Sequence, residues 1–340
     1  MSGVAWSIRP YRSGDEAALV ELFGRAFNKR ITTAHWQWKF RGYDAPFQNV
    51  WLAVEGERII FQYAGIPVRV ETEGGPRWAV QSVDTMADPD YRRRGLFGQV
   101  ARHSYQHWRE AGAAFVYGLP NEQSASGFSA LGFGTPFSLH WRRHPLRPFA
   151  ILARRSRINF PTEMLDRLWF ALRSSREPRR NFDLAEVLHL DESVDLLWDR
   201  YRPDGIAVVR NRDWIRWRYL SAPGLGYRLL IAKGGDGPLG YAAYRLQDGG
   251  GMLADVFAAD DDVSLALIHG AIDRLRNSGA RSIAALAVPG SRFDKLGDQL
   301  RFLSGERFKF IVLPLAEDIS ADQLSDPSAW HLSGGDFDVV

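Results

Sequence analysis

The sequence predicts a mixed α/β chain built from two copies of one fold. Residues 78–133 have the pattern of a strand, a helix, a second strand and a short helix, which makes them the centre of the first copy. Two strands precede this stretch and are joined to it by glycine turns, as in an antiparallel meander, so the sheet is expected to be mixed. The same succession returns about 177 residues later, and so long a repeat indicates two domains and not a solenoid.

The first copy is expected to begin with a short strand at 8–10. The apolar spacing from Ala18 to Phe27 predicts an amphipathic helix after it. The aromatic stretch at 35–40 is expected to pack in the core, with a substrate cleft as the alternative. Strands follow at 50–55 and 59–70.

The central strand at 78–86 breaks at Asp88-Pro89-Asp90, so the chain leaves the sheet at that point. A helix is predicted at 96–111 and a second strand at 113–119. An extended segment at 136–143 completes the first copy.

A basic loop precedes the helix at 96–111. Three arginines and a glycine, Arg92 to Gly95, lie where backbone N–H groups have no helical partner and the helix dipole is positive. Glycine lets an anion approach the backbone, and guanidinium groups add charge-assisted hydrogen bonds to phosphate oxygens. The loop therefore predicts a diphosphate site, although a solvated basic turn is the alternative.

The second copy changes this loop. It has Asp260-Asp261-Asp262 and no glycine. Carboxylates suit a helix N-terminus but repel a diphosphate, so only the first copy is expected to bind one. The matching strand, helix and strand are predicted at 252–257, 263–277 and 282–289.

Two motifs together resemble a known family. The pattern Arg92-x-x-Gly95-x-Phe97 after a strand, followed by Asn121 and Gly132-Phe133 at the family's spacing, is similar to the GNAT superfamily of acyl-CoA-dependent N-acyltransferases. The resemblance implies two tandem GNAT-like domains, the second degenerate, as in Eis-like enzymes or those of polysaccharide biosynthesis. The expected division is an acyl-CoA-binding domain at 1–143, a basic inter-domain arm at 144–181, a second domain at 182–316 and a tail at 317–340.

The resemblance also implies that acetyl-CoA or another short acyl-CoA is the co-substrate. The backbone of the central strand would run along the pantetheine arm, the basic loop would hold the diphosphate, and the end of the next strand would face the arm. The expected binding residues are Val83, Thr85, Ala87, Arg92, Arg93, Arg94, Gly95, Leu96, Phe97, Gly98, Asn121 and Phe128.

Two of these residues depart from the family pattern. Phe97 replaces a small residue and resembles the bulkier Arg-Arg-Arg-Gly-Leu variant of Eis-type enzymes. Phe128 stands where many members carry a tyrosine that protonates the departing thiolate, and a phenyl ring has no proton to give.

Direct attack of an amine on the thioester in a ternary complex requires a base. Asp84 on the central strand is the first candidate, with a structural hydrogen bond as its alternative role, and Glu122 is the second. Tyr117 is the candidate for protonating the thiolate. The tail offers three further carboxylates, those of Asp336, Asp338 and the C-terminal Val340.

The resemblance implies an N-acyltransferase that transfers an acetyl or short acyl group to a primary amine, and an amino sugar in polysaccharide biosynthesis is the expected acceptor. An Eis-like aminoglycoside or amine acetyltransferase and a non-catalytic acyl-CoA sensor are the alternatives. An aminoacyl transferase of the Fem type is disfavoured by the diphosphate loop.

Composition and charge limit the classes of co-substrate and binding partner that the chain is expected to have. The chain has no cysteine, which excludes thiol nucleophiles and disulfides, and no metal is expected. The net charge of +3 suits an anionic co-substrate but is too small to predict nucleic-acid binding. No apolar run is long enough for a membrane span, residues 1–12 lack the apolar core of a secretory signal, and a cytoplasmic protein is expected. The arginine-rich arm is expected to present a solvated basic face, with a membrane surface or an acidic partner as the alternative.

Overall fold

The computed structural model describes residues 6–44, 46–157, 161–173 and 181–338. The chain divides into two compact units that interleave along the sequence. Unit 1 comprises Met1–Phe137, Gly205–Val209 and Lys309–Ala329, and unit 2 comprises Ser138–Asp204, Arg210–Phe308 and Trp330–Val340. The sequence predicted domains made of contiguous segments. Unit 1 instead also contains Gly205–Val209 and Lys309–Ala329, which come from the second half of the chain.

Unit 1 contains a mixed sheet with strand order β1-β2-β3-β4-β5-β13. Strands β4 and β5 are parallel, and the other neighbours are antiparallel. The short strand β8 (Ile206–Val208) also pairs with β3. The elements are β1 (Ser7–Pro10), α1 (Glu16–Phe27), α2 (Thr33–Arg41), β2 (Val50–Glu55), β3 (Arg58–Glu71), β4 (Arg77–Ala87), η1 (Pro89–Tyr91), α3 (Leu96–Glu110), β5 (Ala113–Gly118), α4 (Glu122–Ala130) and residues 309–314 of β13 (Leu303–Pro314).

Unit 2 contains a second mixed sheet, with strand order β6-β12-β11-β10-β9-β7. Strands β11 and β12 are parallel, as β4 and β5 are. The elements are β6 (Gly134–Pro145, from residue 138), α5 (Pro148–Ser156), α6 (Glu163–Arg173), β7 (Asp183–Val187), η2 (Glu192–Val194), α7 (Asp195–Tyr201), α8 (Arg212–Ile215), the π-helical turn η3 (Arg216–Leu220), β9 (Arg228–Gly234), β10 (Gly237–Gln247), β11 (Gly250–Ala258), α9 (Asp261–Asn277), β12 (Ser282–Ala287), α10 (Arg292–Gln299), β14 (Trp330–His331) and η5 (Gly334–Asp336).

The two sheets have the same strand order, but their last strands are exchanged. β13, from the second half of the chain, pairs with β5 in unit 1. β6, from the first half, pairs with β12 in unit 2. The mixed α/β fold predicted from the sequence is therefore confirmed, while this exchange of strands was not predicted.

Helices cover both faces of the unit 1 sheet. Helices α3 and α4 pack on one face in an apolar cluster that contains Val100, Trp108 and Phe128, all buried. Helices α1 and α2 contact strands β3 and β4. On that side the indole of Trp36 donates to Gln62 Oε1 at 3.2 Å, so the aromatic residues of α2 pack in the core as predicted, although α2 also supplies a buried charge to the site described below.

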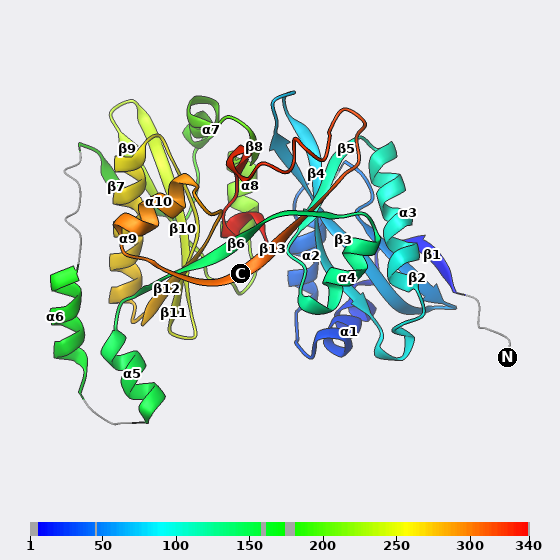
Figure 1. Cartoon of the computed structure of the whole chain (residues 1–340), viewed down its shortest axis with the longest axis horizontal. Coiled ribbons are helices and arrows are strands. Elements are labelled where there is room, and N and C mark those ends of the chain that lie inside the picture. The colour runs from blue at the N-terminus through cyan, green and yellow to red at the C-terminus, as the bar shows by residue number, and fades with distance from the viewer. Residues whose placement is uncertain (1–5, 45, 158–160, 174–180, 339–340) are drawn as a thin grey trace. The chain divides into compact units, whose positions relative to one another are not determined.

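In unit 2, α9 lies along strands β9, β10 and β11 (Figure 1). Its buried side chains, among them Leu267 and Ile268, join Leu230 and Leu253 of the sheet in one apolar cluster. The predicted arm contains helices α5 and α6, which are held together by Asp166: its carboxylate accepts the free N–H groups of Phe149 and Ala150 at the start of α5. No helix among the described residues is both long and apolar enough to cross a bilayer.

Candidate functional site

Strand β4 extends beyond its parallel partner β5. The two strands pair from Trp78 opposite Ala113 to Gln81 opposite Tyr117. β4 remains paired with β3 on its other side as far as Ala87, whereas β5 ends at Gly118 and the chain turns into α4. Residues 83–87 of β4 therefore lie beyond the end of β5, where an extended ligand with amide groups can pair with the strand edge.

A β-bulge lies at the beginning of this unpaired stretch. Gln62 of β3 is opposite Met86, but Ala64 is opposite Val83, so Asp84 and Thr85 together face one residue of β3. Asp84 has φ 45°, in the left-handed region that non-glycine residues rarely adopt. The bulge bends β4 where the sequence predicted only a regular strand, and it sets the direction of the Asp84 side chain.

The carboxylate of Asp84 forms an ion pair with Lys39. Lys39 Nζ donates to Asp84 Oδ2 at 2.8 Å, and the two side chains are only 4% and 12% exposed. Gln62 Nε2 donates to the backbone oxygen of Asp84 at 3.0 Å and fixes the bulge from β3. Sequence reasoning did not identify Lys39; the signal was a lone lysine within the aromatic stretch of α2.

The N-terminus of α3 has no side-chain cap. Gly95 is the N-cap residue with φ 76°, and Arg93 also has a positive φ, 63°. Left-handed turn residues of this kind can direct neighbouring backbone N–H groups into a concave anion site, and the dipole of a 15-residue helix adds to its positive potential. The predicted basic loop thus has the backbone geometry that an anion requires.

The three arginines of this loop differ in their contacts. Arg92 donates to the backbone oxygen of Ala26 at 3.1 Å. The guanidinium of Arg94 lies 4.7 Å from the ring centre of Tyr91, whose hydroxyl donates to Glu55. Arg93 makes no hydrogen bond or ion pair with the rest of the described chain. Since all three are exposed, Arg93 and Arg94 have guanidinium N–H groups that can turn to an anion.

Asp88 anchors the base of the loop. Its buried carboxylate accepts from Arg25 at 3.2 Å, from Arg58 at 2.8 Å and from the backbone N–H of Asp90 at 3.2 Å. Burial alone would raise the pKa of Asp88, but the hydrogen bonds from Arg58 and Asp90 hold it below its usual range. Asp88 therefore stays ionised and ties the turn after β4 to α1 and β3.

Phe97 does not obstruct the anion site. Its side chain turns into the apolar cluster of unit 1, and its ring centre lies 5.1 Å from that of Phe128. A Cβ at Gly127 would lie 2.4 Å from the Phe97 ring, so the glycine provides the space for this packing. The bulky residue at position 97 is thus accommodated by the core, and the backbone of the first helical turn stays accessible.

The other expected site residues lie on β5 and α4, after the arginine loop in the chain. Asn121 caps α4, since its Oδ1 accepts from Ser124 N at 2.9 Å. Glu122 is exposed in the first turn of that helix, and Tyr117 is fully buried in β5. Phe128 is 5% exposed, with its ring between those of Phe97 and Phe133. Its role as a core residue explains why a phenyl ring stands there.

We predict that Phe128→Tyr will not accelerate acyl transfer. The new hydroxyl would enter an apolar cluster without an assured partner, which costs about 1–3 kcal/mol of folding free energy. The expected result is a lower melting temperature with kcat and its pH profile unchanged. A pH profile that gains an acidic group would instead indicate that the ring reaches the reacting thioester.

Among the tail carboxylates, that of Asp336 is held by hydrogen bonds within unit 2. It accepts from Arg210 Nη2 at 2.7 Å and from Ser333 N at 2.7 Å, and it is 3% exposed. Asp338 is partly buried in the same unit, and Val340 lies outside the described residues. The expectation that Asp336 supplies the base is replaced by its structural role.

The corresponding helix start in unit 2 is closed. Asp260 caps α9 by accepting from Val263 N at 2.8 Å, whereas Gly95 provides no such cap to α3. Arg292 donates to the backbone oxygen of Ala258 at 3.0 Å and forms an ion pair with Asp261. The N–H group of Val263 and the side chain of Asp261 at this helix start are therefore already satisfied within unit 2.

Comparison with known proteins agrees with this geometry. Residues 7–135 match the family model described as acetyltransferase (GNAT) domain. The matched segment includes β4, the bulge, the arginine loop and α4. None of the curated proteins matches the chain.

Several solved structures share the fold over most of the chain. A probable N-acyltransferase of unknown function from Enterococcus faecalis V583 has TM-score 0.67 and 14% identity, over 92% of this chain and 73% of its own. A GCN5-related N-acetyltransferase from Anabaena variabilis has TM-score 0.66 and 11% identity over the same shares. Another from Kribbella flavida has TM-score 0.62 and 13% identity, over 91% of this chain and 70% of its own. These similarities establish the fold.

Proposed function

We propose that unit 1 binds acyl-CoA and transfers an acetyl or short acyl group to a primary amine. The observation that carries the proposal is one continuous feature, in which the β4 edge at 83–87 leads to an uncapped helix N-terminus flanked by arginines. GNAT acetyltransferases use acetyl-CoA, and the matched domain contains this feature.

The residues present fit the two polar parts of coenzyme A. The first-turn N–H groups of α3, at Leu96, Phe97 and Gly98, together with Arg93 and Arg94, suit a diphosphate in charge and in hydrogen-bond direction. The backbone of Val83, Thr85 and Ala87 suits the amides of the pantetheine arm, as an added strand would. Bound acyl-CoA would supply an activated thioester, and β4 would hold it in place.

Asp84 is the proposed base for the attacking ammonium in a ternary complex. Its position at the bulge places a carboxylate at the beginning of the unpaired β4 edge, and Lys39 fixes its orientation. Glu122 remains the second candidate, since it is exposed at the start of α4. Tyr117 is a weaker candidate acid than the sequence suggested, because its side chain is fully buried in the sheet.

Unit 2 is proposed to be a degenerate copy of the same domain. It repeats the sheet order of unit 1 with a parallel pair at β11 and β12, but its helix start is capped by Asp260. The proposed acceptor class is a small-molecule primary amine, including amino sugars of polysaccharide biosynthesis and the aminoglycosides of Eis-like enzymes. The proposal of an amino sugar as the acceptor rests on the sequence resemblance alone.

A non-catalytic acyl-CoA sensor is the second candidate. Two observations on proton transfer favour it. Phe128 is buried and has no proton to donate to the thiolate, and the candidate base Asp84 is already ion-paired with Lys39. Such a protein would bind acyl-CoA at the same loop but would release no free thiol.

The test combines calorimetry with a CoA-release assay on the full chain. Acetyl-CoA is expected to bind at one site, and the free thiol is expected to appear when an amino sugar, an aminoglycoside or an aliphatic amine is added. Binding without release from any amine supports the sensor. If acetyl-CoA does not bind at all, both functions are excluded.

A further inference from the structure

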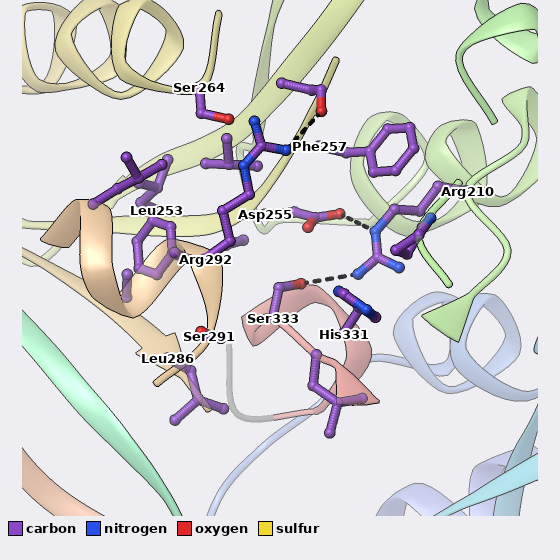
Figure 2. Close-up of a pocket in the computed structure, with 18 of the residues that line it drawn as sticks. Arg210, Leu253, Asp255, Phe257, Ser264, Leu286, Ser291, Arg292, His331 and Ser333 are labelled. Carbon is purple, nitrogen blue, oxygen red and sulfur yellow. Dashed lines mark hydrogen bonds and ion pairs between the residues drawn. The ribbon is translucent and has the colours of Figure 1, made fainter. Parts of the chain in front are cut away.

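Unit 2 contains a cavity of about 130 Å³ where its parallel strands separate (Figure 2). β11 and β12 pair at Gly251 opposite Ile283 and at Met252 opposite Ala284, and β11 then continues to Ala258 paired with β10 on its other side. The position in the fold is the one that the β4 edge has in unit 1. The helix start beside this cavity is capped by Asp260, so the cavity lacks the open N–H groups that the arginine loop offers to an anion in unit 1.

The cavity walls are apolar apart from a few polar groups. Leu253 and Leu286 come from the two strands, and Phe293 and Leu296 come from α10. Ser264 of α9, Ser333 and Asp255 supply polar groups, and the lining also includes the basic residues Arg210, Arg292 and His331. Figure 2 shows these side chains around the same space. A small apolar space with a few polar groups is the usual form of a small-molecule site.

Asp255 has one carboxylate oxygen with no partner. Its Oδ2 accepts three hydrogen bonds, from Arg210 Nε at 3.1 Å, Tyr219 at 3.0 Å and Tyr241 at 2.6 Å. Within the described chain its Oδ1 accepts none, although the residue is only 2% exposed. A buried carboxylate oxygen without a donor is costly, so a ligand that donates a hydrogen bond to it gains that free energy.

The charges near Asp255 decide what kind of donor fits. The buried carboxylate of Asp255 is paired with the guanidinium of Arg210, and burial raises the pKa of Asp336, the second carboxylate that Arg210 contacts. Arg292 also lines the cavity and is paired with Asp261. Burial raises the pKa of Tyr219 and of Tyr241 well above the usual value, so both phenols stay neutral donors. The cluster is thus balanced: an added ammonium would leave it net positive, and an added carboxylate would repel Oδ1.

We propose that this cavity binds a compact neutral molecule that carries an amide N–H or a hydroxyl group. The donor bonds Asp255 Oδ1, and the apolar body lies against Leu253, Leu286 and Phe293. A cavity of about 150 Å³ can hold benzene, so this volume corresponds to about six heavy atoms of ligand. The site belongs to unit 2 and does not depend on acyl transfer by unit 1.

The experiment compares three probes of matched size with the full chain, using saturation-transfer NMR and calorimetry. The probes are N-ethylacetamide, which is neutral, isopentylamine, which is a cation, and isobutyrate, which is an anion. The neutral amide is expected to bind with a Kd of about 1 mM, and both ions at least tenfold more weakly. If an ion binds best, or if no probe binds, the proposal is overturned.

Two variants locate the site. Ser264→Leu fills the cavity from α9, where the hydroxyl it replaces donates only to the backbone oxygen of Asp260, and it should abolish binding of the amide. Ser278→Leu, at the exposed end of the same helix, is the matched control and should leave binding unchanged. Equal binding by both folded variants would overturn the assignment. Asp255→Asn adds a direct test of the acceptor if it folds, and it should weaken amide binding more than tenfold.

Discussion

The double variant Arg93→Glu, Arg94→Glu is expected to weaken acetyl-CoA binding by a hundredfold or more. A hydrogen bond to a charged group contributes about 1.5–3 kcal/mol, and two such bonds to a diphosphate would be replaced by repulsion. Arg94 also loses its contact with the ring of Tyr91, but the fold should survive because both side chains are exposed. Calorimetry with acetyl-CoA measures the change.

The matched control is Arg154→Glu, Arg155→Glu. These arginines are exposed on α5, and their reversal changes the net charge by the same amount away from the loop. The control should bind acetyl-CoA like the parent protein. If both double variants weaken binding equally, general electrostatic attraction and not the loop would explain the result.

The second large effect is expected for Asp84→Asn. Removing the carboxylate takes the charge of Asp84 away from the buried ammonium of Lys39, which costs about 3–5 kcal/mol of folding free energy. If Asp84 is also the base, kcat should fall by about 10²–10⁴-fold, and the pH profile should lose its acidic limb, where protonation of the base lowers the rate. Thermal unfolding and the CoA-release assay measure the two effects separately.

A double variant distinguishes the two roles of Asp84. Lys39→Met combined with Asp84→Asn removes both charges, so much of the lost stability should return. Activity should stay low if Asp84 removes the proton. Recovery of activity together with stability would instead assign Asp84 a structural role, and Glu122→Gln would then test the exposed alternative.

Local elements of the fold were predictable from the sequence because they depend on local patterns. β2 lies at 50–55, as predicted, and α3 ends one residue before the predicted helix does. The arginine loop was also predictable, since glycine and clustered charge before a helix are local signals. The exchange of β6 and β13 was not, because both are extended segments and only the packed sheets select their partners.

The site was predictable only in part, for physical reasons that particular residues show. The bulge at Asp84 needs a positive φ at a non-glycine residue, which no sequence pattern indicates. Lys39 is far from Asp84 in sequence, so only the packing of α2 against the sheet reveals the pair. Phe128 was placed beside the co-substrate by resemblance, yet its apolar ring lies in the core with Phe97 and Phe133.

The exchanged strands determine how the chain can be divided. A fragment that ends at residue 181 would contain β5 without β13, and the remaining fragment would contain β12 without β6. Each half would then expose a sheet edge that invites aggregation. The two halves should therefore be insoluble when produced separately and should reassemble when produced together, so the whole chain is the smallest autonomous folding unit.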